Sequence, residues 1–230
     1  MSAPVWITAF VLHRRPYRET SYLVDFFTLE SGRVSAVAKG VKNSKGDRKS
    51  LLQPFGLVRI QLRGKTELKN LSQIEAADRM TVLTGTALFC GMYLNELINR
   101  ILPQGLASEL MFDQYQRTLQ ALQHTDTPDV PLREFEFGLL EELGQLPDWL
   151  TDARSGEAVT AEHWYRFMPE NGIVLARQAG EKGSFPGYAL QQMVALDWTP
   201  AARKAAKLIS RHALFPLLGD KPLKSRELFR

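Results

Sequence analysis

The stretch that decides the fold is RVSAVAKGVKNSKGDRKSLLQPFGLVRIQLRGKTELK, residues 33–69. In residues 33–39 apolar side chains occupy every second position, and only Val37 interrupts the polar ones. In residues 55–63, Val58, Ile60 and Leu62 alternate with Arg59, Gln61 and Arg63. A strand sends successive side chains to opposite faces, so this alternation predicts two strands that each bury one face. Residues 40–50 contain Gly, Asn, Ser and Lys with almost nothing to bury, which predicts a loop.

The same stretch is strongly basic. It holds ten Lys or Arg against two acids, Asp47 and Glu67. Residues 1–80 hold fourteen Lys or Arg and seven acids, whereas residues 81–230 hold fifteen Lys or Arg and eighteen acids. The net charge of +4 is therefore the sum of a basic N-terminal part and a mildly acidic C-terminal part. We expect the basic N-terminal part to bind a polyanion.

Three further strand-like runs flank these two strands. Residues 6–15, 20–28 and 67–75 are short and separated by basic turns. Five short strands with basic connections are typical of a small closed barrel of the OB type, which commonly binds single-stranded nucleic acid. An SH3-like barrel has a similar pattern, and periodicity alone does not separate the two.

After residue 78 the apolar period changes from two to between three and four, which predicts helices. The first apolar stripe is Leu83, Ala87, Cys90, Leu94, Leu97 and Ile101.

Caps and breakers predict the bounds of three later helices. Ser108 can cap the second helix. The third is expected to begin at Asp129 and end at Gly144, and the fourth to begin after Thr199 and end before Pro216.

Residues 146–186 have a different pattern. HWYRF and IVLAR flank MPENG, which predicts a β-hairpin with Asn171 and Gly172 in its turn. We therefore expect an α+β fold: an N-terminal five-stranded OB-type β-barrel at residues 1–79, then a mainly α-helical domain at residues 80–230 with a small β-hairpin insertion at about 146–186.

Several classes of protein are not supported. The single cysteine, Cys90, excludes an internal disulfide and a cysteine zinc cluster. The longest uncharged run, residues 80–95, is shorter than a membrane span, and the start has no cationic region before its apolar run, so we expect a cytoplasmic protein. The sequence contains no HExxH, GxxxxGK[ST] or GxSxG motif, and Glu134 and Glu136 are expected on the solvent side of a helix. We expect no catalytic residue, metal or cofactor.

Five ordered segments carry a resemblance to a known family. They are RETSYLVDFFTLESGRVSAVAKG (18–40), LLQPF (51–55), GKTELKNLSQIE (64–75), LFCGMYLNELINRIL (88–102) and LGDKPLKSRELF (218–229). Together they resemble the DNA repair protein RecO family, the bacterial recombination mediators. The segments span nearly the whole chain.

The resemblance implies an OB domain, a helical domain and no enzymatic turnover. It implies a protein that binds single- and double-stranded DNA, anneals complementary strands and associates with RecR. It also implies binding to the acidic C-terminal tail of the single-stranded DNA-binding protein (SSB) and, with RecR, help in loading RecA onto SSB-covered strands. A nucleoid-associated location follows from the same resemblance.

In one respect the chain departs from the family pattern. Several members hold a four-cysteine zinc site in the insertion, and residues 146–179 contain no cysteine here. We therefore expect no zinc, and expect the insertion to hold its shape by packing of Trp149, Trp164, Tyr165 and Phe167.

DNA contact needs cations on an accessible face, because much of the binding free energy comes from counterion release. The candidates are Arg15, Arg18, Arg33, Lys39, Lys42, Lys45, Arg48, Lys49, Arg63, Lys65 and Lys69. Tyr17, in a turn beside Arg18, is the candidate for base stacking. The alternatives are an ordinary solvated basic face, a protein scaffold with an acidic partner, or an OB protein that binds RNA.

A second candidate site lies on the fourth helix. At about 100° per residue, Arg203, Lys207 and Arg211 fall within about 80° of one another, opposite the apolar side. A cationic row beside packed helices is suitable for the SSB tail, an acidic peptide that ends in an apolar residue. Arg133, at the start of the third helix, is expected to join the row. An ordinary solvated face is the alternative.

Overall fold

The computed structural model describes residues 5–42, 48–78 and 81–229. The chain divides into two compact units, Met1–Asp126 with Pro222–Arg230, and Thr127–Lys221. The second unit is therefore inserted into the sequence of the first. The expected domain end at residue 79 falls within the first unit, and that boundary stays a prediction.

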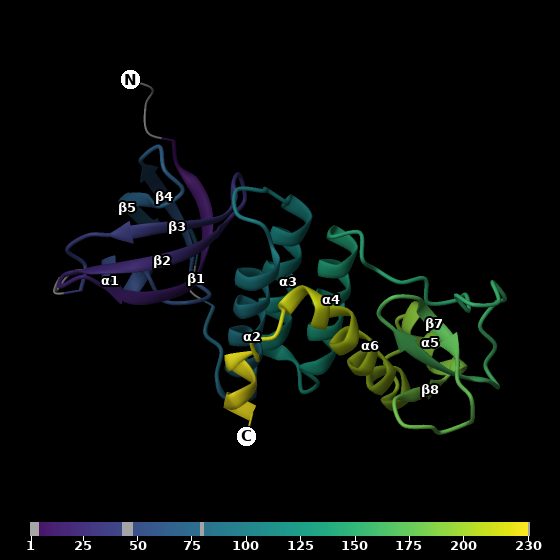
Figure 1. Cartoon of the computed structure of the whole chain (residues 1–230). Coiled ribbons are helices and arrows are strands. Elements are labelled where there is room, and N and C mark those ends of the chain that lie inside the picture. Colours follow the sequence, from purple (N-terminus) through teal and green to yellow (C-terminus); the bar gives the residue numbers. More distant parts are fainter. Residues whose placement is uncertain (1–4, 43–47, 79–80, 230) are drawn as a thin grey trace. The chain divides into compact units, whose positions relative to one another are not determined.

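The first unit contains a closed five-stranded barrel with strand order β1-β2-β3-β5-β4 (Figure 1). Its strands are β1 (Ile7–Tyr17), β2 (Ser21–Thr28), β3 (Gly32–Ala38), β4 (Leu57–Arg63) and β5 (Lys69–Ala76), and a short helix, α1 (Arg48–Leu51), precedes β4. Neighbouring strands are antiparallel except β3 and β5, which run parallel and close the barrel with Ala36 opposite Lys69. The predicted OB-type barrel is confirmed, and each strand begins and ends within two residues of the predicted position.

The barrel buries side chains on two faces, which explains why β1 does not alternate cleanly. Val11, Val24, Phe26 and Ile60 fill the interior. Phe10, on the outer face of β1, packs against helix α3 (Glu109–His124), with ring centroids 5.1 Å from Phe112 and 5.0 Å from Tyr115. Both faces of β1 are therefore apolar near its start.

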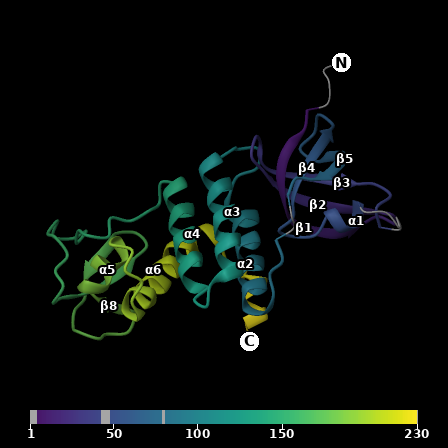
Figure 2. The same ribbon diagram turned by 180° about the vertical axis from the view of Figure 1, so that it is seen from behind.

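Helix α2 (Gly85–Ile101) joins the barrel to α3. Asn95 of α2 donates from Nδ2 to the carbonyl of Leu12 at 2.7 Å, and Tyr115 of α3 donates to the Asn95 side-chain oxygen. Gly32 sits at φ 61° directly beneath the Leu106 carbonyl, where a Cβ would collide with the backbone. The C-terminal 3₁₀ helix η1 (Lys224–Phe229) lies along α2 (Figures 1 and 2).

The second unit joins helices to a small sheet. It contains α4 (Asp129–Glu142), β6 (Trp164–Met168), β7 (Gly172–Leu175), β8 (Ser184–Pro186), α5 (Gly187–Val194) and α6 (Pro200–Leu218). The β6–β7 hairpin is confirmed, with Gly172 at φ 102°. The pattern did not predict β8, which completes the sheet order β7-β6-β8.

The helix caps were predicted correctly and one helix end was not. Ser108 accepts a hydrogen bond from the N–H of Met111 and Thr199 accepts one from the N–H of Ala202. Helix α6, however, continues through Pro216 to Leu218 and ends before Gly219, which has φ 65°. A proline in the last turn removes only one helical hydrogen bond, and because this turn is exposed the freed carbonyl can be hydrated.

Aromatic packing stabilises the insertion. Tyr165 is buried in the core that β6 shares with α5 and α6, and Trp149 and Phe167 pack against the same core. Trp164 is half-buried. Asp152 adds polar contacts: its carboxylate accepts the N–H of Arg154 at 2.8 Å and that of Leu175 at 3.2 Å.

Candidate nucleic-acid interface

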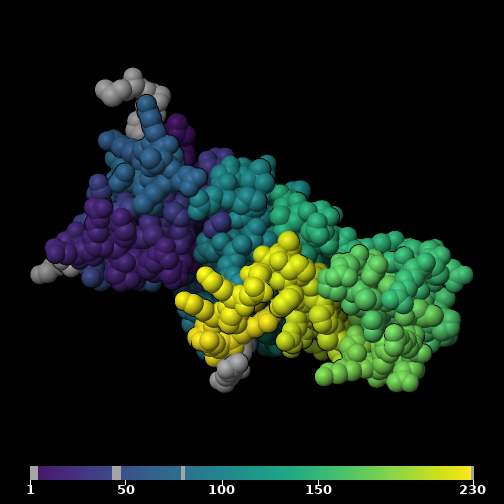
Figure 3. Space-filling view, viewed as in Figure 1, coloured from purple at the N-terminus to yellow at the C-terminus, as the bar shows by residue number. Residues whose placement is uncertain are grey.

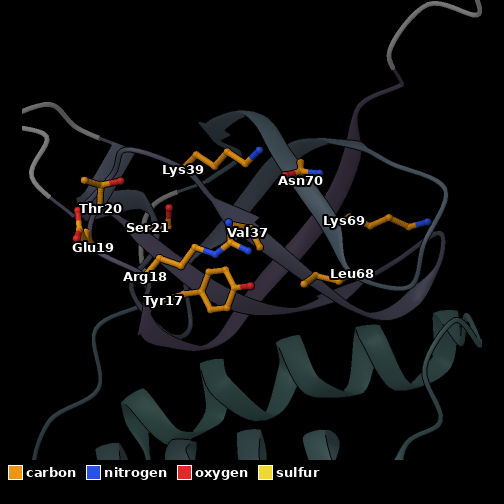
Figure 4. Close-up of a pocket in the computed structure, with 10 residues that line it drawn as sticks. All are labelled: Tyr17, Arg18, Glu19, Thr20, Ser21, Val37, Lys39, Leu68, Lys69 and Asn70. Atoms are coloured by element: carbon orange, nitrogen blue, oxygen red, sulfur yellow. The ribbon is translucent and has the colours of Figure 1, made fainter.

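A pocket of about 770 Å³ lies where the β1–β2 turn, the end of β3 and the start of β5 meet (Figure 4). We call it the barrel pocket; its lining includes Tyr17, Arg18, Val37, Lys39, Leu68 and Lys69. The parallel pairing of β3 with β5 sets Val37 opposite Asn70 and so brings these segments together. Oligonucleotides commonly bind OB barrels on the β2–β3 face, between the β1–β2 and β4–β5 loops. The barrel pocket occupies that place.

Tyr17 and Arg18 form a pair at one side of the pocket. The guanidinium carbon of Arg18 lies 5.2 Å from the centre of the Tyr17 ring, which is a cation–π contact. Arg18 has φ 51°, a left-handed conformation that is uncommon for a residue with a Cβ. The cation–π contact therefore forms in a turn whose backbone conformation is itself uncommon.

Two lysines add positive charge to the same pocket. Lys39 is exposed directly after β3, and Lys69 donates from Nζ to the Gly64 carbonyl at 3.2 Å. Among the described residues that line the pocket, Glu19 is the one acid. The barrel pocket is therefore a cationic concavity with an aromatic side chain in its wall.

Other predicted residues surround the pocket without lining it. Arg15 is exposed on β1, two positions before Tyr17, and Arg63 is exposed at the end of β4. Lys65 is exposed in the β4–β5 turn. Figure 3 shows the surface of β1, β2 and β3, coloured purple, exposed on the viewed face.

The basic loop contributes a further group of cations. The N–H of Lys42 donates to the Thr20 carbonyl at 3.0 Å, which places its backbone beside the β1–β2 turn. Lys49 is exposed on α1. Arg48 is half-buried and donates to the Ser72 carbonyl at 3.5 Å. Lys45 lies outside the described residues.

Arg33 is occupied inside the first unit. Its Nε donates to the Leu102 carbonyl at 2.7 Å and its Nη1 to Asn99 at 3.5 Å. Burial lowers the pKa of Arg33, with Asp25 acting in the opposite direction. Because its donors join β3 to the end of α2, we leave Arg33 out of the proposed DNA-contact set.

Sequence reasoning missed two other arginine–aromatic pairs on the barrel. Arg14 lies 5.1 Å from the Tyr22 ring centre, and Arg59 lies 5.3 Å from that of Trp6. The run HRRPYR at residues 13–18 was the available signal for Arg14. Arg59 also forms an ion pair with Glu75 at 3.2 Å, which offsets its charge.

The second unit carries the predicted row of cations on α6. Lys207 and Arg211 are exposed, whereas Arg203 is half-buried with its Nη1 3.4 Å from an Asp129 carboxylate oxygen. The pattern did not single out Phe215, which lies one turn beyond Arg211 and is 65% exposed.

Arg133 does not belong to that exposed row. It is buried, and its Nη1 lies 2.6 Å from both Glu136 Oε2 and Ser210 Oγ. Glu136 is fully buried, so the expectation that it faces solvent was wrong. The two charges face inward because they pair with each other.

The described residues show neither a metal-ligand cluster nor a membrane-spanning helix. No three His, Cys, Asp or Glu side chains in residues 5–42, 48–78 and 81–229 gather as metal ligands would. Over the same residues, no helix is long and apolar enough to cross a membrane.

Comparison with known proteins identifies the family. Residues 1–80 match the family model described as recombination protein O N terminal, and residues 83–227 match the model described as recombination protein O C terminal. The chain belongs to the RecO family. The N-terminal RecO model covers the barrel and the C-terminal RecO model covers α2 to η1, apart from the last residues.

Curated RecO relatives match over nearly their full length. The chain is 53% identical over 226 residues to DNA repair protein RecO of Alteromonas mediterranea, covering 97% of this chain and 96% of the relative. It is 46% identical over 224 residues to that of Pseudoalteromonas atlantica (97% and 93%), and 43% identical over 227 residues to that of Proteus mirabilis (98% and 92%). The chain is thus a DNA repair protein of the RecO family, and none of these names denotes an enzyme.

Proposed function

We propose that this RecO-family chain is a non-enzymatic recombination mediator that binds single- and double-stranded DNA through the barrel pocket. The observation that carries the proposal is that Arg18, Lys39, Lys69 and Tyr17 line one pocket at the oligonucleotide-binding place of an OB barrel. Cations on loops contact phosphates whatever the sequence. Binding without sequence preference follows.

A second contact, with the SSB C-terminal tail, is proposed for α6. Lys207 and Arg211 are exposed and supply charge for an acidic peptide, and the exposed ring of Phe215 supplies apolar surface one turn further on. Charge steers association and an apolar anchor slows dissociation. Arg203 can contribute once Asp129 is displaced, while Arg133 is excluded because it is buried.

Family membership supports the remaining parts of the proposal. Association with RecR, and with it the loading of RecA on SSB-covered strands, would place the protein in the cytoplasm at the nucleoid. Annealing would follow from charge, since cations that neutralise phosphates on two strands lower their mutual repulsion.

Charge reversal tests the two contacts separately. In the variant Lys39→Glu/Lys69→Glu we expect affinity for labelled single strands to fall by about tenfold or more at low salt, because two phosphate contacts are lost. Affinity for an acidic SSB-tail peptide should stay unchanged. The variant Lys207→Glu/Arg211→Glu should show the opposite pattern.

Three outcomes would change the proposal. Equal loss of both activities in both variants would remove the separation into two contacts. If the chain is a protein scaffold, the unmodified chain should not bind DNA, and Lys39→Glu/Lys69→Glu can show no loss. If it is an OB protein that binds RNA, it should bind an RNA strand far more tightly than DNA of the same sequence. Circular dichroism of each variant controls for folding.

A further inference from the structure

The pair formed by Tyr17 and Arg18 has features that a phosphate contact alone does not require. A phosphate is satisfied by any mobile cation, yet here the guanidinium lies against an aromatic ring, its carbon 5.2 Å from the ring centre. The Arg18 backbone has φ 51°, and such conformations concentrate at functional sites. The guanidinium and the phenol ring are both planar groups, and a base can stack on either.

The rest of the barrel pocket combines three chemistries. Val37 and Leu68 give apolar surface, and Asn70 gives an amide that can donate and accept hydrogen bonds. Figure 4 shows the Arg18 side chain above the Tyr17 ring and directed toward Val37, with Lys39 and Lys69 on different sides of the pair. A nucleotide has the matching parts: a planar base with polar edges and flanking phosphates. The pocket volume of about 770 Å³ lies within the range of small-molecule sites.

We propose that the barrel pocket takes one unpaired nucleobase, stacked on the Arg18–Tyr17 pair, with neighbouring phosphates on Lys39 and Lys69. This rests on the proposed function, because it assumes that nucleic acid is the ligand of the pocket. A base in a duplex is already stacked and paired and would have to be extruded before it could enter. The pocket is therefore the element that favours single strands over duplex, while the surrounding cations bind both.

The test separates charge from planarity. Arg18→Lys keeps the positive charge but removes the planar group, and Tyr17→Leu removes the ring. Lys65→Ala is the matched control, because Lys65 is an exposed cation of the β4–β5 turn that does not line the pocket. Affinities are measured by fluorescence anisotropy for a thymine oligonucleotide, a duplex of equal length, and an abasic strand with the same number of phosphates.

We expect Arg18→Lys and Tyr17→Leu each to weaken single-strand binding by about tenfold, as the loss of one stacked base does, and to change duplex binding by less than about twofold. Lys65→Ala should weaken both forms alike. The unmodified protein should bind the abasic strand about as weakly as Arg18→Lys binds the thymine strand.

The results distinguish this proposal from the one on which it rests. If Arg18→Lys and Tyr17→Leu weaken single-strand and duplex binding equally, or if the abasic strand binds as tightly as the thymine strand, the base pocket is refuted while DNA binding by the barrel stands. If no nucleic acid binds in a salt-dependent way, the proposed function itself fails.

Discussion

Glu96 of α2 accepts two hydrogen bonds from Ser225, one from its backbone N–H at 2.9 Å and one from its hydroxyl at 2.7 Å. A third comes from the N–H of Lys224 at 3.0 Å, and Arg100 lies 3.5 Å away as an ion-pair partner. The segment LGDKPLKSRELF therefore docks its 3₁₀ helix on α2 through one carboxylate. Lys224 remains exposed beside this contact.

Removing the charge of Glu96 should loosen the C-terminal segment. We expect Glu96→Gln to lower the free energy of unfolding by about 1–2 kcal/mol, because an amide replaces the charged acceptor and its NH2 group must face either the Ser225 donors or the Lys224 N–H. Urea denaturation followed by circular dichroism measures this. Glu67→Gln, in the exposed β4–β5 turn, is the control. Equal stability of the two variants would show that the carboxylate contributes nothing to docking.

The same contact should depend on pH. Burial by itself raises the pKa of Glu96, but the hydrogen bonds from Ser225 and Lys224 and the charge of Arg100 outweigh it, so the pKa lies below its ordinary value of 4.5. A carboxyl whose pKa is depressed on folding stabilises the fold above its unfolded pKa, and that contribution disappears as pH falls through the folded pKa. The stability difference between the unmodified chain and Glu96→Gln should be full at pH 7 and shrink below about pH 4.5. A difference that is constant with pH would contradict this.

Arg133 is expected to affect stability and not peptide binding. Removing one member of a buried ion pair leaves the other unpaired, so Arg133→Leu should cost about 3–5 kcal/mol of unfolding free energy. The double variant Arg133→Leu/Glu136→Leu should recover much of that loss, since no charge is then buried. Lys207→Ala is the comparison variant, and we expect it to bind an acidic peptide more weakly while its stability is unchanged. If folded Arg133→Leu binds the peptide as weakly as Lys207→Ala, Arg133 contacts the ligand after all.

Local patterns were enough to predict the barrel strands and most helix caps, because alternation, glycine positions and capping residues act within a few residues. Partners distant in sequence were not predictable in this way. Residues 36 and 69 meet only because β3 and β5 pair in parallel, and that pairing creates the barrel pocket. Arg133 and Glu136 were expected at the surface because each is charged. Their mutual pairing and Ser210, 77 residues away, allow both to be buried.

The electrostatic part of DNA binding predicts a definite salt dependence. Lys39 and Lys69 line the pocket, and Arg15, Arg63 and Lys65 are exposed around it. If these five cations each neutralise one phosphate of a single strand, the slope of log K against log salt should be about −3.5, from about −0.7 per phosphate. Because Lys39→Glu/Lys69→Glu removes two of the contacts, its slope should be nearer −2, or about 1.4 units shallower. Anisotropy titrations at several salt concentrations give both slopes. Equal slopes for the two proteins would mean that Lys39 and Lys69 do not contact phosphate, and a slope near zero for the unmodified chain would mean that binding is not electrostatic.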